Sequence, residues 1–192
     1  QAPAWSPDSR HLLVTALDDA NTPMVLEIEP VSGRVQRLPI PTPRPAQAVY
    51  GPGDTLFVVE EEPGKGGTAL VAYDRRSWAA QGRIADVSQV RVDPSTGRLF
   101  YTRLDANGLW AVDATLDPAR IVRLSDTVPS RWRYRSWSVT RNGDVAYLNA
   151  EPACRSRVDR YRVAADRLVA LDSACVDPVA YSATNGFSTS ER

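Results

Sequence analysis

His11 is the first residue to consider for chemistry, because it is the only histidine among the 192 residues. A metal site built from several histidines is therefore excluded, and a serine–histidine–aspartate triad would have to use His11 itself. It begins the apolar run HLLVTAL directly after a turn, where a partly exposed strand residue is expected. The sequence contains no G-x-S-x-G elbow, Walker loop or G-x-G-x-x-G motif. We therefore predict a protein that is not an enzyme, with no catalytic residue, no metal site and no cofactor.

Three further polar stretches are interpreted as turns. The glutamate run 60–62 precedes a proline and is expected at a solvated hairpin tip, with a cation site as the alternative. The stretch GKGG at 64–67 has the composition of a phosphate loop, but it lies between two predicted strands and no helix follows it. The stretch DANG at 105–108 lacks the later acidic ligand that an EF-hand requires. A plain β-turn is therefore expected there.

The most unusual stretch is basic and aromatic and consists of Arg131, Trp132, Arg133, Tyr134 and Arg135. In an extended chain its three arginines fall on one face and its two aromatic residues on the other. It could form a surface for an anionic ligand or an acidic protein, with arginine–aromatic stacking contributing to binding. It could equally be a linker whose aromatic side chains pack on a neighbouring sheet. We take these residues as the candidate binding site and leave both interpretations open.

The overall charge is balanced, since 23 basic and 23 acidic residues give a formal net charge of zero. No global field therefore directs the chain to nucleic acid or anionic lipid. No apolar run reaches the length of about 18 residues that a membrane span needs. Membrane attachment would therefore depend on another segment. Because the sequence begins at Gln1, we expect a processed product or an excised part of a longer chain.

A repeat of similar length organises the whole sequence. The turns SPDSR, GPGD, DPSTGR, RNGD and TSER end at Arg10, Asp54, Arg98, Asp144 and Arg192, at intervals of 44, 44, 46 and 48 residues. The first four turns are each followed by an apolar run with the composition of a half-buried strand, and tight-turn sequences such as Asn-Gly separate the later strands. We expect each main turn to join the inner two strands of its unit.

Four short strands in each repeat of this length predict an all-β fold, a β-propeller of four-stranded antiparallel blades. We place the blades at 1–45, 46–87, 88–127 and 128–175, with the first strand of a further blade at 176–192. The repeated turn at the end favours an arc that is part of a larger propeller, although a closed ring of four blades remains an alternative. An arc leaves sheet surfaces open and would favour self-association. Trp5, Trp78 and Trp110 are expected to pack in the core or between blades.

Two segments resemble known propeller repeats. The phrase PAWSPDSR at 3–10 is similar to the P-x-W-S-P-D-G-R turn of TolB, of prolyl-oligopeptidase-type propellers, and of membrane-tethered winged-helix regulators of the CadC type. Ser9 stands where these repeats usually have glycine. The segments LWAVD at 109–113 and IVRLS at 121–125 resemble the second half of the same repeat.

The resemblance is closest in type to the C-terminal sensory propeller of CadC-type transcriptional regulators. It implies a non-catalytic domain outside the bacterial cytoplasm that binds a small ligand or an envelope protein. A DNA-binding domain and a membrane helix would then lie upstream, and this segment would not contact nucleic acid. The alternatives are a TolB-like periplasmic scaffold for envelope proteins and the propeller domain of a prolyl-oligopeptidase-type peptidase.

Cys154 and Cys175 are the only cysteines, which is too few for a zinc site of four thiolates. They fall at neighbouring strand ends of the predicted fourth blade, so a disulfide between them is geometrically reasonable. Two free thiols are the alternative. A disulfide would indicate an oxidising compartment, which in a bacterium is the periplasm or beyond.

Mass spectrometry of the native protein tests the disulfide. We expect reduction to add the mass of two hydrogen atoms, and a thiol-alkylating reagent to label neither Cys154 nor Cys175 until the protein is reduced. Labelling of both thiols without reductant would contradict the disulfide and remove the argument for the periplasm.

Overall fold

The computed structural model describes residues 3–62, 64, 66–126, 137–151 and 155–176, and these form four separate four-stranded sheets. Blade 1 consists of β1 (Ala4–Trp5), β2 (Leu12–Leu17), β3 (Pro23–Glu29) and β4 (Arg34–Arg37). Blade 2 consists of β5 (Pro45–Tyr50), β6 (Thr55–Glu61), β7 (Thr68–Asp74) and β8 (Ala80–Ala85). Blade 3 consists of β9 (Val87–Val92), β10 (Leu99–Arg103), β11 (Leu109–Val112) and β12 (Val122–Ser125). Blade 4 consists of β13 (Trp137–Val139), β14 (Val145–Glu151), β15 (Arg155–Ala164) and β16 (Arg167–Cys175).

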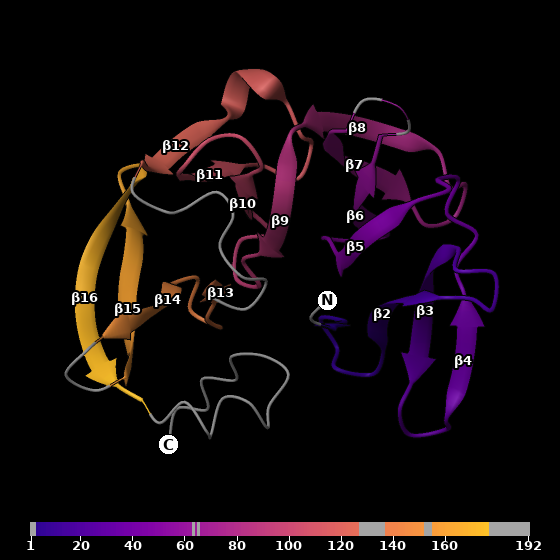
Figure 1. Ribbon diagram of the computed structural model, residues 1–192, viewed down its shortest axis with the longest axis horizontal. Coiled ribbons are helices and arrows are strands. Elements are labelled where there is room, and N and C mark those ends of the chain that lie inside the picture. The colour runs from indigo at the N-terminus through magenta and orange to yellow at the C-terminus, as the bar shows by residue number, and fades with distance from the viewer. Residues whose placement is uncertain (1–2, 63, 65, 127–136, 152–154, 177–192) are drawn as a thin grey trace.

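Each blade is an antiparallel meander in which every strand pairs with the next one along the chain. The blades are arranged around a common centre, with β5, β9 and β13 nearest to it and β4, β8, β12 and β16 at the rim (Figure 1). The prediction of an all-β propeller with four-stranded antiparallel blades is therefore confirmed. A short 3-10 helix, Pro118–Arg120, lies between β11 and β12. Over the described ranges, no helix has the length and apolarity needed to cross a membrane.

Apolar side chains on both faces of a blade hold it to its neighbours. We call the face toward the preceding blade the upstream face and the opposite one the downstream face. Successive residues of a strand point to opposite faces, so Leu56 packs upstream with Leu13 of blade 1, and Phe57 packs downstream with Leu99 of blade 3. A third cluster joins blades 3 and 4 in the same way. Leu56, Phe57 and Leu99 are all fully buried.

Glutamine side chains on the innermost strands connect consecutive blades near the axis. The Gln47 Nε2 atom donates to the Val90 carbonyl at 2.9 Å, and the Val90 N–H donates to Gln47 Oε1 at 3.1 Å. Gln89 accepts from the Trp137 indole N–H at 3.0 Å, which joins β9 to β13. Both glutamines are buried, so these bonds satisfy polar groups that water does not reach.

The turn in PAWSPDSR joins β1 to β2, the inner two strands of blade 1, as predicted. The Ser6 hydroxyl oxygen accepts from the backbone N–H groups of Arg10 and His11, at 3.2 and 2.9 Å, and donates to Asp8 at 2.6 Å. Ser9 has a φ of 58°, a left-handed conformation that glycine adopts most easily. This explains why the related repeats usually have glycine at this position. Ser6 and Asp8 therefore stabilise the turn through these hydrogen bonds.

The three tryptophans differ in their environment. Trp110 is buried in the cluster between blades 2 and 3, and Trp78 packs against the cluster between blades 1 and 2. Trp5 is 56% exposed, so the prediction of core or inter-blade packing is wrong for this residue. It pairs with Leu12 and lies on the upstream face of blade 1, opposite to the face that packs on blade 2.

Replacement of Gln47 tests the connection between blades 2 and 3. We expect Gln47→Ala to lower the free energy of unfolding by about 2 kcal/mol, because it leaves the buried N–H and carbonyl of Val90 without a partner. Urea denaturation measures the change. The matched control is Gln36→Ala on the exposed strand β4, where a change within about 0.5 kcal/mol is expected. Equal stability of the two variants would contradict the role of Gln47.

Candidate functional site

Part of the predicted site lies beyond the residues that can be described. Residues 127–136, which include Arg131, Trp132, Arg133, Tyr134 and Arg135, are outside the described ranges, as is Cys154. Cys175 is the last residue of β16. The basic and aromatic surface and the pairing of Cys154 with Cys175 therefore stay predictions.

His11 and the GKGG and DANG stretches lie at the ends of strands or between them, as expected. His11 is half-buried and immediately precedes β2. Gly64, Gly66 and Gly67 lie between β6 and β7, whose ends pair through Glu61 and Thr68, and Lys65 is outside the described residues. The DANG stretch connects β10 to β11. In the part of the chain that the structure describes, no group of three or more His, Cys, Asp or Glu residues is arranged to hold a metal ion.

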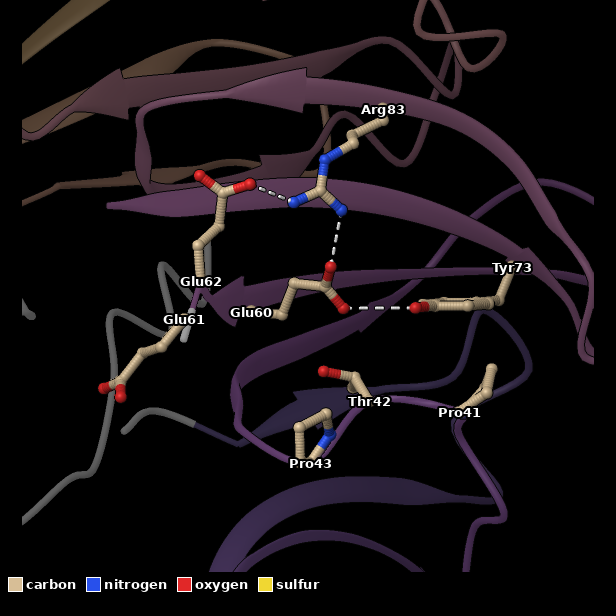
Figure 2. A pocket seen from close by; sticks show the side chains of 8 residues that line it. All are labelled: Pro41, Thr42, Pro43, Glu60, Glu61, Glu62, Tyr73 and Arg83. Atoms are coloured by element: carbon tan, nitrogen blue, oxygen red, sulfur yellow. Dashed lines mark hydrogen bonds and ion pairs between the residues drawn. The ribbon is translucent and has the colours of Figure 1, made fainter. Parts of the chain in front are cut away.

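A pocket lies where the linker between blades 1 and 2 crosses the upstream face of blade 2. Its volume is about 240 Å³. One wall comes from the linker and the other from β6, β7 and β8, as Figure 2 shows. The lining residues are Pro41, Thr42, Pro43, Glu60, Glu61, Glu62, Tyr73 and Arg83. We call these eight residues the linker pocket.

Arg83 organises the carboxylates of the linker pocket. Its Nη1 atom bonds Glu60 Oε1 at 2.6 Å and its Nη2 atom bonds Glu62 Oε1 at 2.6 Å (Figure 2). The Tyr73 hydroxyl donates to the other Glu60 oxygen at 3.1 Å. Glu61 forms a longer ion pair with Arg44, at 3.5 Å. Both carboxylate oxygens of Glu60 are thus bonded, one to Tyr73 on β7 and the other to Arg83 on β8.

Strand alternation explains why Glu60 is buried. It lies two residues after Val58 and four after Leu56, so it points to the same upstream face as these apolar side chains. Only 8% of its surface is exposed. The expectation of a solvated hairpin tip is therefore wrong for Glu60, because this residue is still inside β6. A buried carboxylate needs bonded partners, and Arg83 and Tyr73 provide them.

These contacts change the proton affinities of the partners. Burial, and then the negative charge of Glu60, raise the pKa of Tyr73 to about 12. The hydrogen bond with Glu60, and then the one with Glu62, raise the pKa of Arg83 above its usual value. Tyr73 therefore remains a hydrogen-bond donor and Arg83 a cation at neutral pH.

The linker pocket can attract positively charged groups. The lining residues include three glutamates and one arginine, so their summed charge is negative, although the Glu61 side chain points away from Glu60 and Glu62 (Figure 2) and pairs with Arg44. Glu60 is fully engaged, but a carboxylate has about four acceptor positions, so Glu61 and Glu62 can accept further hydrogen bonds. Pro41 and Pro43 add a rigid apolar wall. This combination suits a ligand with a cationic head and an apolar body.

The sequence reasoning missed Arg83, Tyr73 and the prolines of the linker. A signal for Glu60 was present, because alternation along TLFVVEE places it on the face of Leu56 and Val58. Arg83 could not be paired with Glu60 in advance, because the two residues are on β8 and β6, with β7 between them. Only the strand register brings them together.

No family model and no curated protein matches the sequence. Solved structures are similar in fold. TolB from Acinetobacter baumannii has a TM-score of 0.61 at 18% identity, over 83% of this chain and 40% of that one. A chain of a nidogen/laminin complex has a TM-score of 0.59 at 10% identity, over 89% and 61%. A puromycin-hydrolysing peptidase from Mycobacterium tuberculosis has a TM-score of 0.55 at 13% identity, over 91% and 31%.

These similarities identify the class of protein. The chain is a β-propeller, and its fold is similar to that of TolB. It spans between 31% and 61% of the length of these similar chains. The similar structures include an enzyme as well as a protein from a complex, so the fold is compatible with more than one activity.

Replacement of single glutamates tests the arrangement of the linker pocket. We expect Glu60→Gln to lower the free energy of unfolding by about 2 kcal/mol, because it removes the charge that the bonds from Arg83 and Tyr73 require. Glu61→Gln is the matched control, because the Glu61 side chain is 54% exposed and its ion pair is long. A change within about 0.5 kcal/mol is expected for it. Chemical denaturation near neutral pH compares the two, and equal effects would contradict the special role of Glu60.

Proposed function

We propose that this chain is a non-catalytic binding propeller that recognises a positively charged group of a small ligand or of a partner protein. The observation that supports this most directly is the linker pocket, where Arg83 holds the carboxylates of Glu60 and Glu62 in place. The negative charge favours cations over anions. The fold adds support, because a nidogen/laminin complex is among the similar structures.

The cellular role that we propose is that of a sensor outside the bacterial cytoplasm, as part of a membrane-tethered transcriptional regulator. The PAWSPDSR turn supports it through its resemblance to the repeats of such regulators. A TolB-like periplasmic scaffold is the second candidate, favoured by the structural similarity to TolB. The coding sequence upstream distinguishes them, since a regulator needs a winged helix and a hydrophobic span whereas a periplasmic scaffold needs a cleaved signal peptide.

The basic and aromatic residues 131–135 remain a proposed second contact surface. Their charge is opposite to that of the linker pocket, so the two surfaces would recognise different groups. An acidic partner would bind at 131–135, and a cationic group would bind between the linker and blade 2.

Calorimetric titration tests binding at the linker pocket. The probe is agmatine, which has a guanidinium group and an ammonium group on an apolar chain. We expect agmatine to bind, and the double variant Glu61→Gln/Glu62→Gln to weaken its binding by about tenfold or more, since a loss of about 1.4 kcal/mol has that effect.

Two controls accompany this titration. Glu29→Gln removes a carboxylate of blade 1 outside the linker pocket, and it should leave agmatine binding unchanged. Glutarate has the opposite charge and should not bind. Equal agmatine binding by the double variant and the unmodified protein, or equal binding of glutarate and agmatine, would contradict the proposal.

A further inference from the structure

Two arginines on the upstream face of blade 3 contact the same tryptophan. The Arg103 Cζ atom lies 5.0 Å from the centre of the Trp110 ring, and the Arg123 Cζ atom lies 5.5 Å from it. The Tyr101 ring stacks on the same indole, with its centre 6.1 Å away. Arg123 also donates to the Asn107 carbonyl at 2.9 Å. We call Tyr101, Arg103, Trp110 and Arg123 the arginine–tryptophan cluster.

Arg123 is the counterpart of Arg83 in the linker pocket. Arg83 on β8 pairs with Val71 of β7, which pairs in turn with Val58 of β6. Arg123 on β12 pairs in the same order across β11 and β10, through the two aromatic members of the cluster. Paired residues point to the same face of a sheet, which is the upstream face in both blades. The outermost strand therefore has an arginine at the same position in both blades.

The partner of this arginine differs between the two blades. Glu60 follows Val58 by two residues in β6, and its carboxylate bonds Arg83 at 2.6 Å. Arg103 follows Tyr101 by two residues in β10, and its contact with the indole shows that it also points upstream. Blade 3 thus has a second cation where blade 2 has a carboxylate. The cluster has a charge of two guanidiniums at the position where the linker pocket has an internal ion pair.

Arg103 has no anionic partner among the described residues. It is half-buried, and its Nε atom is buried without a hydrogen-bond partner. Two other half-buried arginines, Arg75 and Arg98, each bond a carboxylate, at 2.6 and 2.9 Å. Asp86 and Asp105 lie near Arg103, but both are exposed and neither forms an ion pair with it. Since buried charges are normally paired, a bound anion would give Arg103 the kind of partner that Arg75 and Arg98 already have.

Arg123 can be reached from the rim of the molecule. It is an exposed residue of β12, the outermost strand of blade 3 (Figure 1). Asp126 follows three residues later and is also exposed, but it does not form an ion pair with Arg123. In blade 2, residues 41–43 form one wall of the linker pocket, whereas a single residue, Asp86, separates β8 from β9. That wall therefore has no equivalent in the linker between blades 2 and 3.

We propose that the arginine–tryptophan cluster binds a dianionic phosphate group. Phosphate in a monoester has a charge of about −1.5 to −2 at neutral pH and three acceptor oxygens. One such group can therefore accept hydrogen bonds from both arginines and balance their charge, whereas one carboxylate balances a single arginine. The planar guanidinium binds phosphate through two parallel hydrogen bonds.

The contacts with Trp110 favour this role. Stacking of each guanidinium on the indole restricts its side chain before a ligand arrives, and this lowers the entropy lost on binding. The bond from Arg123 to Asn107 has the same effect. The cluster is separate from the linker pocket and has the opposite charge, so this binding site is additional to the one proposed above.

Calorimetric titration of the purified chain with inorganic phosphate and with phenyl phosphate tests the proposal. We expect binding at one site, and we expect Arg123→Gln to weaken it by about tenfold or more. Arg123 is exposed, so this substitution should not prevent folding. The matched control is Arg34→Gln on the exposed strand β4, which should leave binding unchanged. Tighter binding of phenyl phosphate would identify a monoester as the ligand, and tighter binding of inorganic phosphate would identify the free ion. Either result supports the proposal.

Arg103→Glu tests the comparison with blade 2. A carboxylate at this position should bond Arg123 as Glu60 bonds Arg83, so we expect phosphate binding to be lost while chemical denaturation shows a folded protein. The double variant Glu61→Gln/Glu62→Gln should bind phosphate as the unmodified protein does. Failure of the linker pocket to bind agmatine would therefore be distinguishable from failure of the cluster to bind phosphate.

Three outcomes would overturn the proposal. The first is that neither probe binds at millimolar concentration. The second is equal weakening by Arg34→Gln and Arg123→Gln, because the attraction would then depend on total charge alone. The third is binding of glutarate as tightly as phosphate. Glutarate has its two charges on separate carboxylates and should not bind detectably.

Discussion

Packing of one apolar sheet face on the next is the interaction on which this structure depends. A four-stranded blade has two faces, and alternation along its strands gives each face its own set of side chains. Blade 2 shows the complete arrangement, with Leu56 buried on one side and Phe57 on the other. The stability of each blade therefore depends on packing against the neighbouring blades. The turns, the inner glutamines and the linkers set the distance and angle at which these faces meet.

The polar residues between the blades have a different role. Glu27 bonds Tyr50 and Arg75 across the junction of blades 1 and 2, and Glu60 bonds Tyr73 and Arg83 within blade 2 beside the linker. Both groups place charged side chains at fixed positions beside apolar packing. The linker pocket contains the second of these groups, Glu60 with Tyr73 and Arg83.

The repeat made the fold predictable, whereas the site depended on register that no local pattern shows. PAWSPDSR and its counterparts recur at nearly constant spacing, and local turn chemistry is enough to place the strands that follow. Arg83 and Glu60 are 23 residues apart and meet only because β6, β7 and β8 pair in one particular register. Trp5 was misjudged because its sequence position matches that of buried residues in other blades. The residue type was interpreted correctly, but among the described residues no other blade packs on the face of blade 1 to which Trp5 belongs.

The nearest-neighbour contacts also determine how the protein loses its structure. Among the described residues, blades 2 and 3 each pack on two neighbouring blades, whereas blades 1 and 4 each pack on one, and β16 is mostly exposed. In such an array the free energy is close to a sum over units and over the junctions between them. Fluctuations therefore begin in the end blades and move inward, so that the amides of blades 2 and 3 exchange last and the connection through Gln47 and Val90 is the final one to break.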